Sequence, residues 1–413
     1  MPLWRRTLYT VWITQFIGVA GFSFVMPFIP YYIQELGVTD LAEVGIWSGV
    51  VTSAQAVSMA IMAPVWGALS DRYGRKLMVL RASFAGAIVL TLMGFVTNVW
   101  QLAFLRAIQG MLTGTVSATT TLVASVVPKD RSGMALGSLQ TAIFLGVSLG
   151  PLLGGLSGDA FGYRQSFWIT GALLALSGLL VLIFVHEDFR PAEAGAGSDR
   201  ASFRQGLTVV FASGALLAVL GSRILLRIGT RTPDPILPLF VQTLLSGEGQ
   251  VGTITGVIAA ASALGAAVGS PLIGSWSDRM GRRKLLLASS IAAGLLYIPQ
   301  AFVQDARWLI VWQLASGFAV GGTLSTLTSL LMHVAPAGRE GTVFGLDASA
   351  VSAANAIGPL MGATVAAWAG LRAPFLLASV LFGVGVLAVT LWVHEAPPAT
   401  IDAHPMPRTG RFN

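Results

Sequence analysis

Long runs of apolar residues, separated by short polar segments, make up most of the chain. A helix needs about 20 residues to cross a bilayer core that is roughly 30 Å thick. Runs of this length lie near 8–33, 44–69, 77–97, 99–127, 133–158, 164–185, 213–244, 251–276, 284–303, 307–334, 341–368 and 373–394. The pattern predicts an all-α, polytopic membrane protein with twelve transmembrane helices.

Composition supports the same interpretation. Of 413 residues, 54% are hydrophobic and only 10% are charged, whereas soluble domains carry about 25% charged residues. The chain also contains 48 glycines, and small residues let membrane helices pack closely. Because the chain has no cysteine, disulfides, thiolate metal sites and cysteine nucleophiles are excluded.

The net charge of +7 does not indicate a nucleic-acid partner, because the basic residues are distributed as in a membrane protein. Eighteen of the 25 Lys and Arg residues fall in the tails and in alternate loops, while the opposite loops hold only Arg164, Arg307 and Arg372. Lys and Arg accumulate on the cytoplasmic side of membrane proteins. We therefore predict a multi-pass protein of the inner (cytoplasmic) membrane, with both termini in the cytoplasm.

The chain divides into two halves that repeat each other. We predict an N-terminal six-helix bundle over 1–186, a cytoplasmic linker over 187–206, a C-terminal six-helix bundle over 207–396 and a cytoplasmic tail over 397–413. GALSDRYGRK at 67–76 returns as GSWSDRMGRRK at 274–284, and Gly150-Pro151 returns as Gly358-Pro359. Internal repeats are typical of transporters that alternate access around a central site. The alternative is two tandem membrane domains without a shared cavity.

The segment between the second and third predicted helices, which we call the signature loop, carries the strongest local motif. Its glycines permit a tight turn, and one carboxylate among several cations fits a charged latch at the membrane surface. The alternative is that the basic residues only determine topology. With the C-terminal copy and two basic residues from other loops, the predicted latch comprises Gly67, Asp71, Arg72, Gly74, Arg75, Asp278, Arg279, Gly281, Arg282, Arg131 and Arg339.

This loop resembles the signature motif of the major facilitator superfamily, and the resemblance covers nearly the whole chain. Leu102-x-x-x-Arg106-x-x-Gln109-Gly110 matches a second family motif. Gly146-x-x-x-Gly150-Pro151-x-x-Gly154-Gly155 is similar to the pattern of twelve-helix drug:proton antiporters. The resemblance implies a proton-driven, monomeric exporter of small molecules that needs no cofactor, and it places Arg106 in proton coupling.

The helix-five motif has a physical reading of its own. Glycines at helical spacing form a groove for a neighbouring helix, and Pro151 removes one backbone hydrogen bond and bends its helix. Since Gly358-Pro359 repeats part of the motif, a role in packing alone remains an alternative.

Ionisable residues inside the predicted helices are few, and such residues are expensive in lipid. In the seventh helix, Arg223, Arg227, Arg231 and Asp234 follow one another at spacings of four, four and three, which places them on one helix face. We predict that Asp234 and Asp347 carry protons together with Arg106, because a buried carboxylate can bind and release a proton as its surroundings change. The alternative is that the two carboxylates only neutralise arginines.

A central cavity is the expected binding site for substrate. For its lining we predict the polar and aromatic residues Arg223, Arg227, Arg231, Gln15, Phe16, Phe24 and Gln109. Many drug antiporters carry an acidic residue in helix one, whereas this chain has Gln15 there. Three arginines facing the cavity suit an anionic or zwitterionic substrate.

The predicted function is proton-coupled export of amphipathic compounds or drugs by alternating access. The alternative keeps the fold but exports a specific endogenous solute, a sugar or an organic anion, with the arginines of helix seven. The sequence has no intramembrane His and carboxylate pairs at metal spacing and no Gly-x-x-x-x-Gly-Lys-Ser/Thr loop. A membrane enzyme and an ATP-driven pump are therefore not expected.

Overall fold

The computed structural model describes residues 3–128, 131–187, 214–245, 250–334 and 340–392. Most of the predicted linker, the whole tail over 397–413 and the predicted latch residue Arg339 lie outside these ranges. All regular structure in the described residues is helical.

The N-terminal half contains α1 (Leu3–Phe24), the short η1 (Met26–Phe28), α2 (Ile29–Glu35), α3 (Leu41–Tyr73), α4 (Arg75–Met93), α5 (Val99–Leu112), α6 (Thr115–Val126), α7 (Ser132–Phe161) and α8 (Tyr163–Phe184). The C-terminal half contains α10 (Gly214–Arg231), α11 (Leu237–Leu244), α12 (Val251–Met280), α13 (Arg282–Phe302), α14 (Ala306–Val334), α15 (Glu340–Ala369) and α16 (Ala373–Trp392).

Twelve membrane crossings follow from these helices. Ten spans among the described residues are long and apolar enough to cross a bilayer individually. The pairs α5–α6 and α10–α11 supply one further crossing each, because each pair continues through a short break. The predicted all-α fold with twelve transmembrane helices is confirmed.

The fourth and seventh crossings are interrupted, where the apolar runs predicted continuous helices. Between α5 and α6, Gly114 adopts a φ of 125°, a left-handed conformation that favours glycine. Between α10 and α11, Pro233 and Pro235 lack the backbone N–H that would continue the helical hydrogen bonds. Asp234 lies in this second break, beyond the end of α10. It therefore does not continue the arginine stripe on the same helix, as the spacing predicted.

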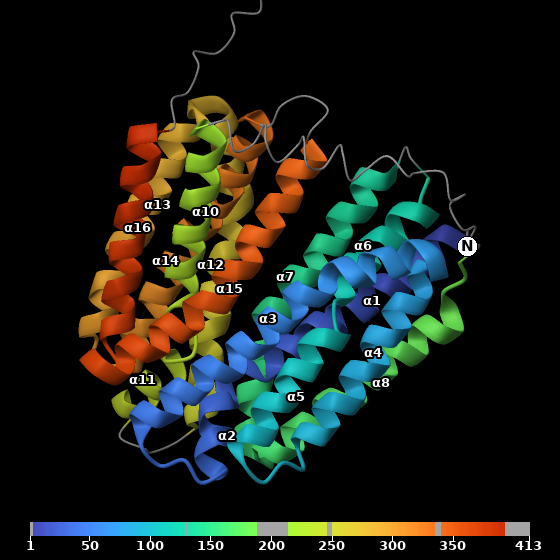
Figure 1. Ribbon diagram of the computed structural model, residues 1–413, viewed down its shortest axis with the longest axis horizontal. Helices are drawn as coiled ribbons and strands as arrows, with labels where there is room; N and C mark the ends of the chain where they lie inside the picture. The colour runs from blue at the N-terminus through green and yellow to red at the C-terminus, as the bar shows by residue number, and fades with distance from the viewer. Residues whose placement is uncertain (1–2, 129–130, 188–213, 246–249, 335–339, 393–413) are drawn as a thin grey trace, which may run out of the picture.

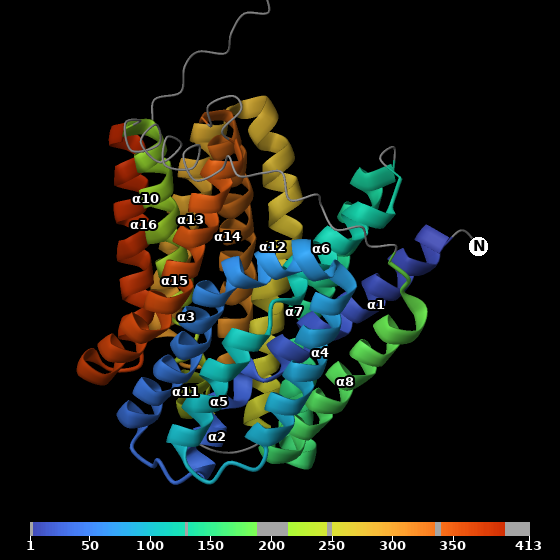
Figure 2. The same cartoon turned by 45° about the vertical axis from the view of Figure 1, so that its right-hand side comes forward.

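The two halves form two bundles that meet at one end of the molecule and diverge at the other (Figures 1 and 2). We call the end that carries α2 and α11 the sealed end, and the end that carries the start of α1 and the α3–α4 turn the open end. Where the bundles meet, α7 packs against α12 and α3 packs against α15.

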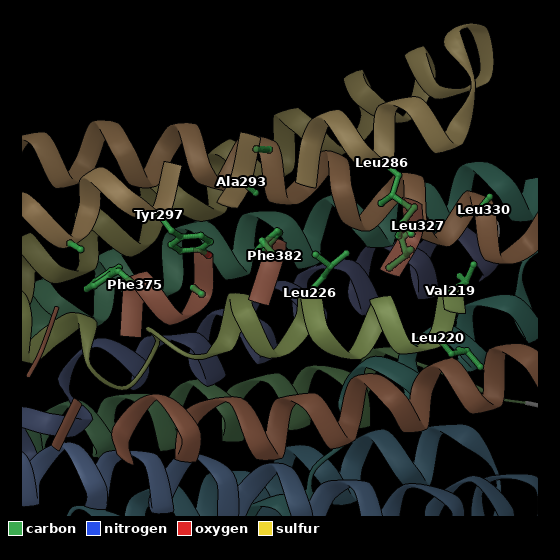
Figure 3. Close-up of a cluster of buried hydrophobic side chains, with 14 of the residues drawn as sticks. Val219, Leu220, Leu226, Leu286, Ala293, Tyr297, Leu327, Leu330, Phe375 and Phe382 are labelled. Carbon is green, nitrogen blue, oxygen red and sulfur yellow. The ribbon is translucent and has the colours of Figure 1, made fainter. Parts of the chain in front are cut away.

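Each half has its own apolar core. In the C-terminal half, Leu226 of α10 lies beside aromatic side chains of α13 and α16 (Figure 3). The rings of Tyr297 and Phe382 are 5.7 Å apart. In the N-terminal half, the ring centres of Phe28 and Phe167 are 5.4 Å apart. This second core extends across the sealed end to Ile236, Leu239 and Ala363 of the other half, so apolar burial helps to hold the two bundles together there.

The sequence repeat is visible in the backbone. Gly74 and Gly281 both have a φ of 96° at the turns that follow α3 and α12. Gly162 and Gly370 have φ values of 91° and 88° at the turns that follow α7 and α15. The repeated sequence segments thus occupy equivalent turns in the two bundles.

Candidate transport cavity and its gates

A cavity of about 920 Å³ lies between the two halves. Its walls are mostly apolar and include Phe22 and Met26 of the N-terminal half and Val320 of the C-terminal half. Pockets that bind drug-sized molecules measure about 300–1,000 Å³ and combine apolar walls with a few polar groups. The cavity therefore has the size and chemistry to hold an amphipathic small molecule.

Hydrogen bonds at the sealed end join the two halves. The Tyr31 hydroxyl donates to the carbonyl oxygen of Pro238 at 2.7 Å and lies 2.8 Å from the Thr255 hydroxyl. The amides of Gln34 and Gln242 exchange hydrogen bonds of 2.9 Å and 3.1 Å. Because these pairs connect α2 with α11 and α12, they close the cavity toward the sealed end.

A carboxylate strengthens the same closure. Asp159, near the C-terminal end of α7, accepts hydrogen bonds from the backbone N–H groups of Gly252 at 3.1 Å and Thr253 at 2.6 Å. Both N–H groups belong to the first turn of α12, which has no intrahelical acceptors for them. A negative charge at a helix N-terminus also interacts favourably with the helix dipole.

The glycines of the helix-five motif bring two neighbouring helices close to α7. A Cβ atom on Gly146 would lie 2.9 Å from the backbone nitrogen of Ala20 on α1, and one on Gly150 would lie 2.6 Å from the Ala20 carbonyl oxygen. A Cβ atom on Gly154 would collide with the backbone of α1, and one on Gly155 with the backbone of α12. At these four glycines, α7 thus leaves room for the backbones of α1 and α12.

The arginines of α10 have three different environments. Arg223 Nε lies 2.9 Å from Asp347 Oδ1 of α15, in an ion pair whose side chains are 13% and 10% exposed. Arg231 Nη1 pairs with Asp234 Oδ2 at 2.8 Å, a pair that is much more exposed. Arg227 forms no ion pair with a carboxylate of the described residues. Its Nε donates to Asn355 Oδ1 at 3.0 Å.

Arg106 lies behind the cavity wall in the N-terminal half. Its side chain is buried, at 1% exposure. Nη1 donates to Gln55 Oε1 at 3.1 Å and to Gln109 Oε1 at 3.3 Å. Of these three residues, only Gln109 lines the cavity. Arg106 is thus held by two neutral amides.

The structure brings some of the residues predicted for the cavity to its wall and places the others elsewhere. Arg227, Arg231 and Gln109 line the cavity. Gln15 is buried, with its amide oxygen accepting from Thr119, and Phe24 belongs to the core of the N-terminal half. The remaining two also lie off the wall, since Phe16 stacks on Trp12 and Arg223 pairs with Asp347.

Residues that the sequence did not single out also contribute to the cavity. Trp66, Tyr297 and Gln313 line it, and the Trp66 indole donates to the Met111 carbonyl oxygen at 2.6 Å. The hydrophobic pattern along a helix does not identify these residues, because positions that face the cavity are as apolar as positions that face lipid.

The predicted latch lies at the open end. Gly74 forms the turn between α3 and α4, whereas Gly67 lies inside α3 with open space beside it and takes no part in the turn. Asp71 is in the last turns of α3, and Asp278 is at the equivalent place in α12. Their neighbours Arg72 and Arg279 are exposed. Gly281 and Arg282 form the equivalent turn between α12 and α13. The guanidinium carbon of Arg131 lies 5.5 Å from the centre of the Trp4 ring.

One further acidic residue, which the sequence did not single out, organises the signature loop. Glu187 accepts hydrogen bonds from the backbone N–H groups of Arg75 at 3.0 Å and Lys76 at 2.7 Å. These groups belong to the first turn of α4, so Glu187 stabilises that helix from its N-terminal end. It lies just after α8, more than a hundred residues away in sequence.

The geometry defines a class of protein. Two helical bundles enclose one cavity that is sealed at one end, and the described residues contain no group of three or more His, Cys, Asp or Glu side chains that could hold a metal ion. Two bundles around a cavity of this kind are the architecture of a membrane-embedded transporter of small molecules. The chain belongs to the Major Facilitator Superfamily, whose model matches residues 11–244 and, a second time, residues 219–411.

Named relatives have a similar length. The chain is 37% identical over 378 residues to the multidrug resistance protein MdtG of Enterobacter lignolyticus (strain SCF1), with 92% of this chain and 90% of the relative covered. It is 36% identical over 374 residues to the protein of the same name from Escherichia coli (strain SMS-3-5 / SECEC), with 91% of both chains covered.

Solved structures share the fold at much lower identity. A bacterial homologue of the human lysosomal transporter Spinster, in an inward-facing and unoccupied conformation, superposes with a TM-score of 0.77 at 16% identity, covering 95% of this chain and 98% of the other. The nucleoside transporter NupG gives a TM-score of 0.77 at 15% identity, covering 96% and 100%.

Proposed function

We propose that the chain exports amphipathic small molecules, drugs among them, in exchange for protons. The names of its relatives support drug export. The observation that carries the proposal is the mostly apolar cavity of about 920 Å³, which lies between the halves and has a charged corner formed by Arg227, Arg231 and Asp234. Such a cavity can accept compounds of varied shape by apolar contact and leave their orientation to a few polar groups.

Orientation follows from charge. The open end carries Arg72, Arg75 and Lys76, whereas the sealed end carries Arg164, Arg307 and Arg372. Since Lys and Arg accumulate on the cytoplasmic side, the open end faces the cytoplasm in our proposal. The conformation is then inward-facing, the state in which an exporter takes up its cargo.

Proton coupling is assigned to Asp347, with Asp234 and Arg106 as further candidates. Asp347 and Arg223 join α15 to α10 through a buried ion pair. Protonation of Asp347 would remove one partner of this pair, and an unpaired buried charge is strongly destabilising. Arg223 would then need another partner, so a proton arriving at Asp347 favours a rearrangement of α10 against α15.

Asp234 fits a less direct role. Its carboxylate pairs with Arg231 at the cavity wall and is 43% exposed. A pair this exposed contributes little stability, so its loss would disturb the surrounding helices less than the loss of the Arg223–Asp347 pair. Asp234 also partly neutralises Arg231, which was the alternative interpretation of this residue.

The latch belongs to the other half of the cycle. We propose that Asp71 and Asp278, with the arginines beside them, hold the open end closed when the molecule faces outward. Asp71→Asn is expected to abolish transport while the protein still reaches the membrane. Wild-type flux from that variant would refute the latch.

Drug susceptibility and dye efflux in a host without its own pumps test the function. Expression of the chain is expected to lower the accumulation of an amphipathic dye, and a protonophore is expected to cancel the effect. The Asp71→Asn variant, which is expected to reach the membrane without transporting, is the control when it is expressed at the same level. No protection against any compound of a chemically broad panel would contradict the proposal.

A second candidate is export of one endogenous solute, a sugar or an organic anion. The observation that favours it is Arg227, a cation at the cavity wall without a carboxylate partner among the described residues. This candidate predicts saturable transport of one polar solute and no change in drug susceptibility.

A further inference from the structure

The charged corner of the cavity has an excess of one positive charge. Among the described residues of the cavity wall, the charged ones are Arg227, Arg231 and Asp234. Asp234 pairs with Arg231, and this leaves the charge of Arg227 without a counterpart. An uncompensated cation in a mostly apolar cavity favours a ligand that brings a negative charge.

A neutral residue of another helix orients this corner. Asn355 Oδ1, on α15, accepts from Arg227 Nε at 3.0 Å and from Arg231 Nε at 3.1 Å. A guanidinium group is planar and presents its donors in a fixed fork. The two bonds to Nε therefore fix the planes of both groups. No described residue accepts a hydrogen bond from Arg227 Nη1 or Nη2, so the fork of Arg227 remains available for a ligand.

The neutrality of Asn355 matters as much as its position. Two like charges share one amide oxygen, which satisfies a donor of each without cancelling either charge. An aspartate at the same place would offer an oxygen with similar geometry and would add a negative charge. The corner would then carry no net charge, and its preference for an anion would disappear.

We propose that Asn355 is a specificity-determining residue that gives the cavity a preference for amphipathic anions. The acid group of the cargo pairs with the fork of Arg227, and its apolar part lies against the wall around Phe22 and Met26 on the opposite half. Asn355 does not line the cavity and acts by positioning Arg227 and Arg231. The inference rests on the proposed export function and adds the charge class of its substrate.

Transport assays in proteoliposomes test this inference with two probes of equal size and opposite charge: a dansyl-labelled medium-chain fatty acid and the matching dansyl-labelled alkylamine. The wild-type protein is expected to have the lower KM for the fatty acid. Asn355→Asp is expected to raise the KM for the fatty acid about tenfold, the effect of losing about 1.4 kcal/mol of a charge-assisted contact. The KM for the amine is expected to stay equal or to fall.

A matched pair of variants separates specificity from structure. Aspartate keeps the hydrogen-bond acceptor for both arginines. If the role of Asn355 were purely structural, Asn355→Asp would transport the fatty acid normally and Asn355→Ala would not. The proposal predicts the loss of anion preference in Asn355→Asp while the thermal unfolding midpoint stays at or above the wild-type value. Arg227→Gln is expected to lose the fatty acid as well and to retain the amine.

The failures of the two proposals are distinguishable. If wild-type protein transports both probes with similar KM, or if Asn355→Asp keeps the wild-type preference, the specificity inference is refuted and export stands. If wild-type protein moves neither probe under a proton gradient, the export of amphipathic compounds is itself contradicted, and the role of Asn355 falls with it.

Discussion

Asp159 of one half and Thr253 of the other are joined by a hydrogen bond of 2.6 Å, from the Thr253 backbone N–H to a carboxylate oxygen. The bond connects the end of α7 to the beginning of α12 across the interface between the bundles. It must break whenever the sealed end opens. The same carboxylate also accepts from Gly252, so its charge and position stabilise the sealed conformation.

Asp159→Asn is expected to weaken the seal. The amide keeps one acceptor but loses the charge that interacts with the N-terminus of α12, a loss of about 1–2 kcal/mol. The fraction of molecules open at this end should rise roughly five- to thirty-fold. The chain contains no cysteine, so spin labels can be attached selectively at Thr39→Cys and Gln304→Cys, two exposed positions at this end. Double electron–electron resonance between the two labels then measures the opening as a longer distance.

Glu35→Gln is the matched control for that measurement, because Glu35 is exposed at the same end and forms no ion pair with a described residue. The distance distribution of Glu35→Gln should equal that of the spin-labelled protein without a further substitution. An unchanged distribution in Asp159→Asn would mean that the other contacts at this end hold it closed without the charge of Asp159.

Asp347→Asn is expected to uncouple transport from the proton gradient. Counterflow exchange of labelled for unlabelled substrate should persist, since the cavity wall is unchanged. The variant should also be less stable by about 3–5 kcal/mol, because Arg223 is left buried without its partner. Thermal unfolding in detergent measures the second effect, and pH-gradient-driven uptake in proteoliposomes measures the first.

The double variant Arg223→Gln with Asp347→Asn separates the two effects. Removing both charges should recover most of the lost stability without restoring the response to the gradient. If substrate uptake by the double variant, or by Asp347→Asn alone, still responds to the pH gradient as in the wild-type protein, Asp347 is excluded as the coupling residue.

Gly150→Ala should impair folding or transport, because its Cβ atom would lie 2.6 Å from the Ala20 carbonyl oxygen, where the backbone of α1 cannot easily move away. A clash of this kind costs about 1–3 kcal/mol. Gly137→Ala is the control on the same helix, since a Cβ atom there meets nothing within 4 Å. That variant should be neutral or slightly stabilising. Equal unfolding midpoints for the two would contradict the tight α1–α7 packing.

Much of the fold was predictable from the sequence, since runs of lipid-crossing length and a repeat at constant offset determine how many helices there are and how they pair. The break between α5 and α6 was not predictable, because Thr113-Gly114 carries no proline and glycine also occurs inside unbroken helices of this chain. Phe24, the last residue of α1, lies in the core of the N-terminal half rather than at the cavity wall, a difference that the pattern of apolar residues does not reveal.

The candidate site was predictable in part. The spacing of Arg227 and Arg231 placed both on one face, and Gln109 came with the helix-four motif. Asn355 and Asp159 were not predicted, because each acts on a helix that is far away in sequence and carries no local motif. Which N-terminus a carboxylate approaches, or which guanidinium an amide binds, is decided by the packing of the two bundles.

The central claim is that the two halves alternate around the cavity and that a proton gradient drives the cargo through it. Cysteines at Gln34 and Gln242, whose amides are 2.9 Å apart, can be joined by a short, reducible thiol cross-linker without interference from other thiols. The measurement is gradient-driven accumulation of an amphipathic dye in proteoliposomes that contain this double variant. The account predicts accumulation before cross-linking, none after it, and recovery on reduction, whereas undiminished accumulation with the cross-link complete would contradict it.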